Sequence, residues 1–325
     1  MANYLVTGAA GFIASRVIEM LLADGHIVYG VDNMSQAYDV RMKEYRLGRL
    51  LQLPGFHFIK LDIALKENLT QLTVFAPQID GVINLAAVAG VRSSVEDPWG
   101  YVATNTIGAL NMLEFCRQNH VKKIVLASTS SLYGNQSKPP HTEEADTNHP
   151  LQPYAASKKG AEVMGYAYHH LYEIDVTILR YFTVYGPAGR PDMVMFRLCQ
   201  WIAEGREVAV TGDGKQSRGF TYLDDIARGT ILGLKPLGYE VINLGGHEIA
   251  SINRLIDMFE QRLGQKARIK YIPFHPADVL ENVADVNKAG RLLGWEPQFG
   301  LEEGVTRLVN WYLEERVWAQ DIATP

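Results

Sequence analysis

Two polar stretches in the middle of the chain contain the residue types that acid–base chemistry needs. STSSLYG supplies four hydroxyl side chains in a row, from Ser128 to Ser131, and YAASK places Tyr154 four residues before Lys158. On a helix, that spacing puts the two side chains on one face. A tyrosine of ordinary pKa, about 10, is a poor base near neutrality, but a neighbouring ammonium group favours the phenolate. The pair therefore predicts a tuned acid–base, although a Tyr/Lys pair is also common on helix surfaces.

A glycine-rich turn near the start of the chain predicts a nucleotide site. TGAAGFIA places Gly8, Gly11 and Ala14 at a Gly-x-x-Gly-x-x-Ala spacing, after a strand-like run and at the opening of a helical pattern. Such a turn lets a pyrophosphate reach a helix N-terminus, where free N–H groups favour negative charge. Asp32 follows the second strand-like run, where a carboxylate can hold ribose hydroxyls and repels a 2′-phosphate. We therefore expect NAD rather than NADP. The nicotinamide cation of bound NAD would further favour the Tyr154 phenolate.

Elements that could position these residues alternate along the first half of the chain. Near-continuous apolar runs predict strands at 4–6, 27–31, 56–60, 82–85, 124–127 and 176–179, and later at 241–244. Helical patterns span 12–23, 104–117 and 154–172. Apolar strands alternating with helices are typical of a parallel sheet covered on both faces. The fold class is therefore α/β, a doubly wound parallel sheet of the Rossmann type.

The pattern changes after about Arg180. Gly, Pro and polar residues become dense, and two clear helical patterns follow at 252–263 and 301–315. We interpret this part as a smaller C-terminal substrate domain that is interleaved with the first. The predicted division gives 1–180 to the first domain, to which 216–246 returns, and 181–215 and 247–325 to the smaller domain. A ligand is expected in the cleft between them.

Composition excludes several classes of protein. The 325 residues are 47% hydrophobic and 21% charged, with a net charge of −5, so there is no basic footprint for nucleic acid. No apolar run approaches the roughly eighteen residues of a membrane span, and the N-terminus lacks the basic region of a signal peptide. Two distant cysteines, Cys116 and Cys199, form neither a disulfide framework nor a zinc site. We expect a cytoplasmic protein without a membrane partner or a metal.

Taken together, these motifs resemble the extended short-chain dehydrogenase/reductase family. The resemblance runs from TGAAGFIA through STSSLYG and YAASK to RYFTVYGP, nearly the whole chain. It implies a Rossmann domain for NAD and a C-terminal domain for a nucleotide diphosphate sugar. Tyr154 would be the catalytic acid–base, Lys158 would hold the nicotinamide ribose and lower the tyrosine pKa, and Thr129 would be the third catalytic residue. A homodimer through a four-helix interface is also implied.

The cofactor site that we expect extends beyond the glycine turn and Asp32. The segment after the third strand could meet the adenine, and small residues after the fourth allow close approach of the backbone. The expected NAD-binding residues are Gly8, Gly11, Phe12, Ile13, Asp32, Asn33, Asp62, Ile63, Leu85, Ala86, Ala87, Tyr154, Lys158 and Tyr181.

The serines after Thr129 bear on the reaction. Nucleotide-sugar 4,6-dehydratases of this family carry Asp-Glu at the positions of Ser130 and Ser131, and UDP-glucuronate decarboxylases carry a glutamate at the second of them. Hydroxyls cannot replace those carboxylic acids, which argues against dehydration and, less firmly, against decarboxylation. Reversible oxidation at C4 with return of hydride to the other face, a 4-epimerisation, remains.

Three segments, beginning at Gly30, Ala89 and Phe182, resemble the UDP-glucuronate 4-epimerases. The implied reaction converts UDP-glucuronate to UDP-galacturonate through a 4-keto intermediate. Arg190 and the hydroxyls could bind the sugar carboxylate. The expected substrate-binding residues are Arg92, Thr129, Ser130, Ser131, Thr183, Arg190, Arg218 and Asp278.

Two features depart from the usual pattern: Ala14 stands at the third glycine position of the turn, and Gly219 replaces an acid after Arg218. The alternatives are a UDP-glucuronate decarboxylase, a UDP-glucose or UDP-N-acetylglucosamine 4-epimerase, and a non-catalytic scaffold that senses NAD.

Overall fold

A seven-stranded parallel sheet forms the centre of the larger part of the computed structural model, which describes residues 1–135, 138–246, 248–273 and 281–324. The strand order is β10-β6-β5-β4-β1-β2-β3, and every neighbouring pair is parallel. The strands are β1 Asn3–Thr7, β2 Ile27–Asp32, β3 Phe56–Lys60, β4 Gly81–Asn84, β5 Lys123–Thr129, β6 Asp175–Tyr181 and β10 Tyr239–Leu244. This arrangement confirms the predicted doubly wound Rossmann sheet.

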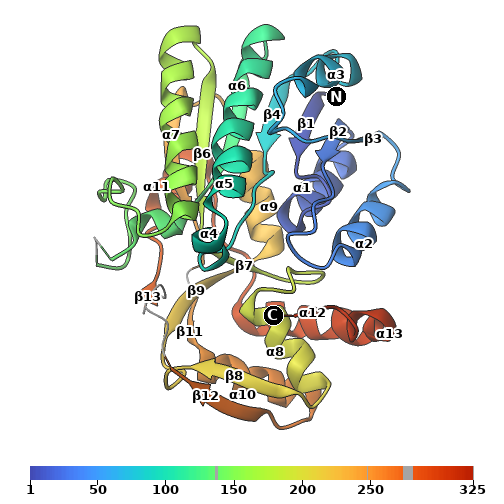
Figure 1. The fold of residues 1–325 in the computed structure, drawn as a ribbon, viewed down its shortest axis with the longest axis vertical. Coiled ribbons are helices and arrows are strands. Elements are labelled where there is room, and N and C mark those ends of the chain that lie inside the picture. The colour runs from blue at the N-terminus through green and yellow to red at the C-terminus, as the bar shows by residue number, and fades with distance from the viewer. Residues whose placement is uncertain (136–137, 247, 274–280, 325) are drawn as a thin grey trace.

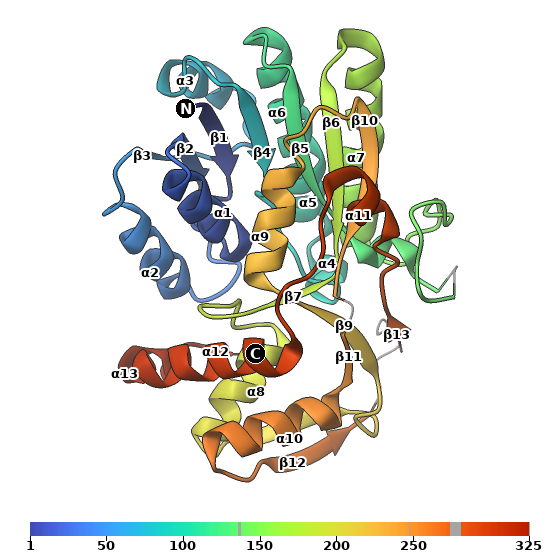
Figure 2. The ribbon, with the colours of Figure 1, turned by 180° about the vertical axis from the view of Figure 1, so that it is seen from behind.

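Helices cover both faces of this sheet, as Figures 1 and 2 show from opposite sides. One face carries α3 (Asn68–Phe75), α6 (Gly108–Gln118) and α7 (Pro153–Tyr172), and the other carries α1 (Phe12–Ala23), α2 (Arg41–Leu50), α9 (Leu223–Leu232) and α11 (Asn287–Leu293). Each face has its own buried apolar cluster, which explains why the strand sequences are apolar on both sides.

The smaller part lies beyond the carboxyl ends of the large sheet (Figure 1). It contains a four-stranded sheet of β7 (Thr183–Tyr185), β9 (Ser217–Tyr222), β11 (Glu248–Ser251) and β13 (Glu281–Asn282), and a pair of β8 (Glu207–Thr211) with β12 (Arg268–Ile272). The helices α8 (Val194–Ala203), α10 (Ile252–Leu263), α12 (Leu301–Glu314) and α13 (Arg316–Ala319) pack around a third apolar cluster.

The chain crosses between the two parts more than once. The predicted return of 216–246 to the larger part begins with β9, which pairs with β7, β11 and β13 of the small sheet, whereas α9 and β10 belong to the large sheet. Later, α11 packs on the large sheet although it lies within the range predicted for the sugar domain. The division into a cofactor domain and a sugar domain stays a prediction.

One predicted helix is not uniform. The pattern at 104–117 predicts a single α-helix, but Val102–Ile107 forms a π-helical turn that leads into α6. Within that turn, the buried Asn105 accepts from Val88 N at 2.9 Å and donates to Val88 O and to the Ser157 hydroxyl at 2.9 Å. The turn thus ties the loop after β4 to α7. Such π-turns occur frequently at functional sites.

Candidate active site

Tyr154 and Lys158 lie in the first two turns of α7, which begins at Pro153. Lys158 is buried, and its Nζ donates to the carbonyl of Ala127 on β5 at 2.9 Å. Burial lowers the pKa of Lys158 to about 8. The Glu162 carboxylate, one turn later on the helix, acts in the opposite direction and raises this pKa. The lysine is therefore anchored at the carboxyl end of the sheet, one turn from the tyrosine.

Tyr154 has three polar or aromatic neighbours at this end of the sheet. Its ring meets the ring of Tyr101, with 6.0 Å between the ring centroids. Burial raises the pKa of Tyr154, whereas its hydrogen bond with Thr129 and the positive charge of Arg190 lower it. Thr129 and Arg190 are far apart in the sequence, so the fold brings three of the predicted site residues together.

The four hydroxyls of STSS do not form one continuous shelf. Ser128 donates to Glu162 Oε1 at 2.6 Å, inside the protein. Ser130 accepts from the Asn282 amide of β13 at 2.8 Å, which links it to the smaller part. Thr129 accepts from the backbone N–H of Ser131 at 3.1 Å, and the two hydroxyls lie 3.2 Å apart. Of the four, Thr129 is therefore the hydroxyl that meets Tyr154, and Ser131 is hydrogen-bonded to Thr129.

A buried ion pair holds this end of β5 in place. Arg180 of β6 donates to both oxygens of Glu162, at 2.9 and 2.8 Å, and to the Tyr133 hydroxyl at 3.0 Å. The Arg180 and Glu162 side chains are 4% and 3% exposed. Since Glu162 also accepts from Ser128, one carboxylate connects α7, β5 and β6 directly beneath the catalytic candidates.

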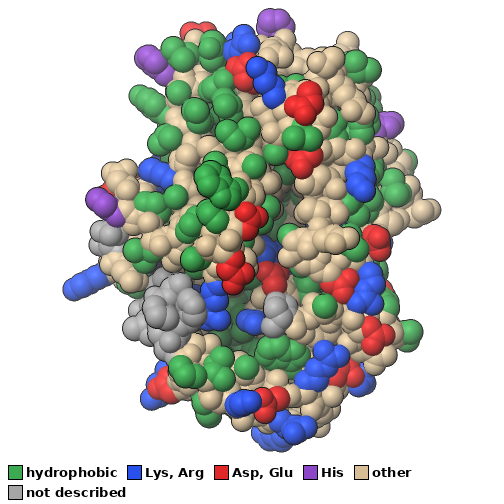
Figure 3. All heavy atoms as spheres, in the orientation of Figure 1, with side chains coloured by type: hydrophobic (Ala, Val, Ile, Leu, Met, Phe, Trp, Pro, Cys, Tyr) green, Lys and Arg blue, Asp and Glu red, His purple; other side chains and the backbone are tan. Residues whose placement is uncertain are grey.

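Arg190 joins two loops at the site. Its guanidinium donates to both oxygens of Asp192, at 3.1 and 2.5 Å, and to the carbonyl of Ala89 at 3.0 Å. Figure 3 shows the hollow between the two parts of the molecule, bordered by charged side chains of both signs. An arginine already paired with one carboxylate can still present charge to a ligand, because a guanidinium has five N–H donors.

The glycine turn forms a close backbone crossing. A Cβ on Gly8 would lie 2.8 Å from the backbone nitrogen of Ala86, and Gly8 has a φ of +69°. A Cβ on Gly11 would lie 2.7 Å from the carbonyl oxygen of Gly8. The turn opens α1, whose first N–H groups have no helical acceptor. This cradle fits the pyrophosphate of a dinucleotide.

Asp32 ends β2 beside that turn. Its carboxylate accepts from Ala10 N at 3.2 Å and Met34 N at 2.7 Å, and Lys43 Nζ lies 3.2 Å away in a buried ion pair. The sequence reasoning missed Lys43, because its eleven-residue separation from Asp32 follows no local spacing rule. The acid is therefore held in place at the position expected for a ribose contact.

The remaining predicted cofactor residues surround the same edge of the sheet. Asn33 donates to Asp62 at 3.0 Å, and Ala86 N donates to the Thr7 hydroxyl at 3.1 Å. Ile63 is buried against α6, whereas the hydroxyl of Tyr181 is buried 2.9 Å from that of Thr230. Others at this edge are Phe12 and Ile13 in the first turn of α1, and Leu85 and Ala87 after β4.

The predicted substrate residues are less concentrated. Thr183 begins β7 directly after β6, near the site, and Arg92 is exposed at the start of α4 (Ser93–Glu96). Arg218 lies on β9 and donates to the carbonyl of Ser217 at 2.7 Å. Asp278 falls outside the described residues.

The two departures from the family pattern have a packing explanation. A Cβ on Gly219 would lie 2.9 Å from the carbonyl oxygen of Gly246, and one on Gly246 would lie 1.7 Å from that of Phe220. No side chain fits between β9 and the segment at Gly246 that follows β10, so an acid at 219 would force them apart. Ala14 is 2% exposed in the cluster between α1 and the sheet, where a methyl group fills space.

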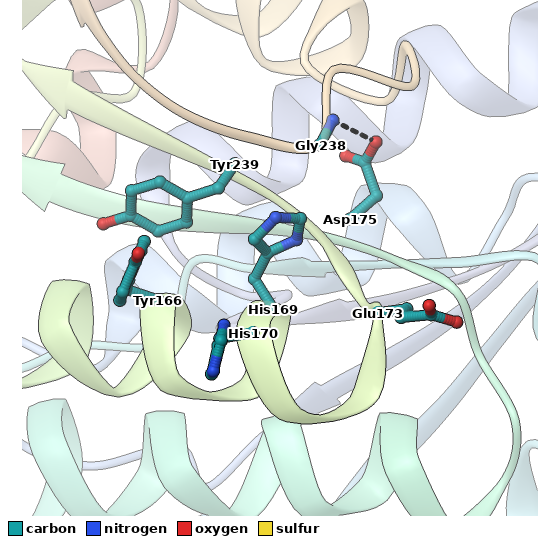
Figure 4. Close-up of a pocket in the computed structure, with 7 residues that line it drawn as sticks. All are labelled: Tyr166, His169, His170, Glu173, Asp175, Gly238 and Tyr239. Atoms are coloured by element: carbon teal, nitrogen blue, oxygen red, sulfur yellow. Dashed lines mark hydrogen bonds between the residues drawn. The ribbon is translucent and has the colours of Figure 1, made fainter.

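A second hollow, of about 680 Å³, lies at the opposite end of the large sheet (Figure 4). It is lined by Tyr166, His169, His170, Glu173, Asp175, Gly238 and Tyr239. Asp175 and Tyr239 begin β6 and β10, whereas the candidate site gathers where strands end. Asp175 accepts from the backbone of Gly238 at 2.6 Å.

Over the described residues, no cluster of three or more His, Cys, Asp or Glu could hold a metal, and no helix could cross a membrane.

Comparison with known proteins gives consistent matches over nearly the whole chain. The model of the NAD dependent epimerase/dehydratase family matches residues 4–245. A relative from Thermodesulfobacterium geofontis, described as UDP-glucuronate 4-epimerase, is 54% identical over 316 residues, covering 97% of each chain. A probable UDP-glucuronate 4-epimerase of Rhizobium meliloti is 37% identical, covering 95% of this chain and 96% of the relative.

Solved structures of 4-epimerases also match this chain over nearly its whole length. UDP-glucuronic acid 4-epimerase from Bacillus cereus, in complex with UDP-glucuronic acid and NAD, is 36% identical with a TM-score of 0.89, covering 96% of this chain and 99% of that one. UDP-glucose 4-epimerase from Thermotoga maritima, with UDP-glucose, is 32% identical with a TM-score of 0.89, covering 97% and 99%.

Proposed function

Because the chain belongs to the NAD-dependent epimerase/dehydratase family, we propose that it interconverts UDP-glucuronate and UDP-galacturonate by 4-epimerisation. The observation that carries the proposal is the composition of the site. Thr129 meets Tyr154 with a hydroxyl, its hydrogen-bonded neighbour Ser131 is a second hydroxyl rather than a carboxylic acid, and the Arg190 guanidinium is close enough to lower the pKa of that tyrosine. The relatives described as UDP-glucuronate 4-epimerases support the same substrate.

In this mechanism Tyr154 moves the proton of the sugar 4-hydroxyl. The Thr129 hydrogen bond orients the phenol and stabilises its phenolate. Lys158 is anchored by Ala127 O, from which its ammonium can hold a ribose hydroxyl. The residues around Gly8 and Asp32 would hold NAD, which would supply the hydride acceptor for C4 and the hydride donor for its opposite face. The ketone must turn over in the site between the two transfers.

The sugar carboxylate places a second demand on the site. Oxidation at C4 gives a β-keto acid, which loses carbon dioxide when its carboxylate aligns with the carbonyl π system. Arg190 and the hydroxyls of Ser131 and Thr183 can hold the carboxylate out of that alignment by charge-assisted hydrogen bonds. Since no carboxylic acid stands at position 130 or 131, the site offers no acid there for dehydration or decarboxylation.

Product identification tests the proposal directly. Purified protein incubated with UDP-glucuronate should give UDP-galacturonate by NMR, without a pentose product or carbon dioxide. Tyr154→Phe should lower turnover by about 10²- to 10⁴-fold while NAD binding is kept. A variant with near-normal turnover would contradict the acid–base assignment. Faster turnover of UDP-glucose than of UDP-glucuronate would instead support a neutral-sugar 4-epimerase.

The proposal includes a homodimer formed through α6 and α7. Apolar side chains are exposed on this side of the molecule (Figure 3), including Val163 and Tyr166 of α7 at 54% and 55% and Ile107 at 40%. Exposed apolar residues on α7 and on the π-helical turn before α6 are typical of a subunit interface. A cytoplasmic location stays a prediction, supported by the buried free cysteines Cys116 and Cys199.

A further inference from the structure

Two arginines from different elements meet at the ring of Tyr38, in the loop between β2 and α2. The guanidinium carbon of Arg46 is 5.7 Å from the centroid of this ring, and that of Arg190 is 5.8 Å from it. Arg46 Nη1 also donates to the Tyr38 hydroxyl at 2.9 Å. The aromatic ring therefore spans the distance between a buried arginine of α2 and the arginine that the proposed function assigns to the substrate carboxylate.

Arg46 is bound to backbone carbonyls rather than to an acid. Its guanidinium donates to Ala188 O at 2.9 and 2.7 Å, to Gly189 O at 3.2 Å and to Ala10 O at 3.1 Å. The residue is 3% exposed, and no carboxylate in the described part of the chain forms an ion pair with it. Since a buried guanidinium is costly to desolvate, its fixed fork here gives geometry rather than charge neutralisation.

Two of the carbonyls that Arg46 binds, those of Ala188 and Gly189, belong to the loop that carries Arg190. Ala188 has a φ of +52°, a left-handed conformation that is unfavourable for an alanine. The two hydrogen bonds from Arg46 to Ala188 O can hold the backbone in that conformation. Arg190 follows two residues later and reaches Asp192 and Ala89 O from there. The loop direction at 188 therefore decides where the Arg190 guanidinium stands.

We propose that Arg46, with Tyr38, is a positioning residue that fixes Arg190 for the substrate carboxylate and so contributes to uronate selectivity. This inference rests on the proposed function. Arg46 also binds Ala10 O in the glycine turn, so one side chain sets the distance between the cofactor turn and the loop of Arg190. A misplaced carboxylate would bind less tightly, and it could rotate into alignment with the C4 ketone. In this decarboxylation of the 4-keto intermediate, the C5–C6 bond breaks and its electron pair forms the C4–C5 enolate. Carbon dioxide leaves, and a proton adds at C5.

The test compares Arg46→Met with Arg49→Met on the same helix. Arg49 is exposed and contacts only the Tyr45 ring and hydroxyl and Glu19 among the described residues, so it serves as the matched control. For Arg46→Met we expect kcat/KM for UDP-glucuronate to fall about 10- to 100-fold, mainly through KM, because an ångström of misplacement is enough for such a loss. The ratio of kcat/KM for UDP-glucuronate to that for UDP-glucose should fall with it, and carbon dioxide release per turnover should rise.

Tyr38→Leu provides a second variant, in case Arg46→Met does not fold. It removes the ring between the two arginines at a half-buried position and should change the same ratio in the same direction. Equal losses on both sugars with unchanged carbon dioxide release would overturn the inference, since they indicate a general structural role. Wild-type protein that does not epimerise UDP-glucuronate would contradict the proposed function instead. Wild-type epimerisation with selectivity kept in both variants would contradict the positioning role alone.

Discussion

Tyr154 and Lys158 respond to burial in opposite directions. Burial raises the pKa of the phenol and lowers the pKa of the ammonium to about 8, so the protein alone favours the neutral form of both. The Thr129 hydrogen bond and the Arg190 charge work against this effect at the tyrosine. The positive charge of an oxidised nicotinamide would add to them, which couples the strength of the base to the cofactor.

The pKa of Lys158 gives a testable pH dependence. Its ammonium form, which the mechanism uses, is present below about pH 8 and is lost as the pH rises through that value. We expect kcat/KM to decline on the alkaline side near pH 8, and Lys158→Met to be less active and to lack this limb. A pH profile from 6 to 10 measures both. An alkaline limb that persists in the variant would assign it to another group.

The buried Glu162–Arg180 pair makes a separate prediction about stability. Glu162→Gln leaves Arg180 buried without a counter-charge, so we expect a loss of about 3–5 kcal/mol in the free energy of unfolding. Glu19→Gln is the control, because Glu19 pairs with Arg16 near the surface and should contribute no more than about 1 kcal/mol. Urea denaturation compares the two. Equal losses in the free energy of unfolding of the two variants would show that the buried pair contributes no more stability than the pair near the surface.

Among the elements, the turn between β1 and α1 packs closely against the segment after β4, and we expect this packing to shape the cofactor site. Gly8 and Gly25 both have positive φ, +69° and +79°, but a Cβ on Gly25 would meet no atom within 4 Å. Gly8→Ala should therefore abolish tight NAD binding, whereas Gly25→Ala should cost only the conformational strain, about 1 kcal/mol. NAD titration by calorimetry and thermal unfolding distinguish the two effects. NAD affinity retained in Gly8→Ala would contradict this account of the turn.

At the scale of the whole molecule, the exposed apolar side of α7 predicts a subunit contact. Val163→Arg places a charge in the middle of that surface and should convert a dimer into a monomer in sedimentation experiments. Val74→Arg, on α3, changes an even more exposed valine, 78% against 54%, and should leave the dimer intact. A wild-type monomer, or a dimer that Val163→Arg does not affect, would place the interface elsewhere or remove it.

The positions of the large-sheet strands along the chain were predictable because each depends on a local sequence pattern. Seven apolar runs predicted the seven strands of the large sheet, since the helices next to them in the sequence bury the inner strands on both faces. None of the described strands of the smaller part was predicted; β12, for example, is exposed along its length, and β13 has only two residues. Their pairing depends on partners far away in the chain, such as Glu281 with Ser217.

Local spacing was enough to predict the cofactor turn and the acid–base pair from the sequence. The glycine turn and Asp32 lie on consecutive elements, and Tyr154 and Lys158 lie on one helix, so their relative positions follow from helix and strand geometry. The division of the hydroxyls was visible only in the folded molecule: Ser128 donates to the buried Glu162, and Ser130 accepts from Asn282. Such partners come from distant segments, and their contacts exist only after those segments pack.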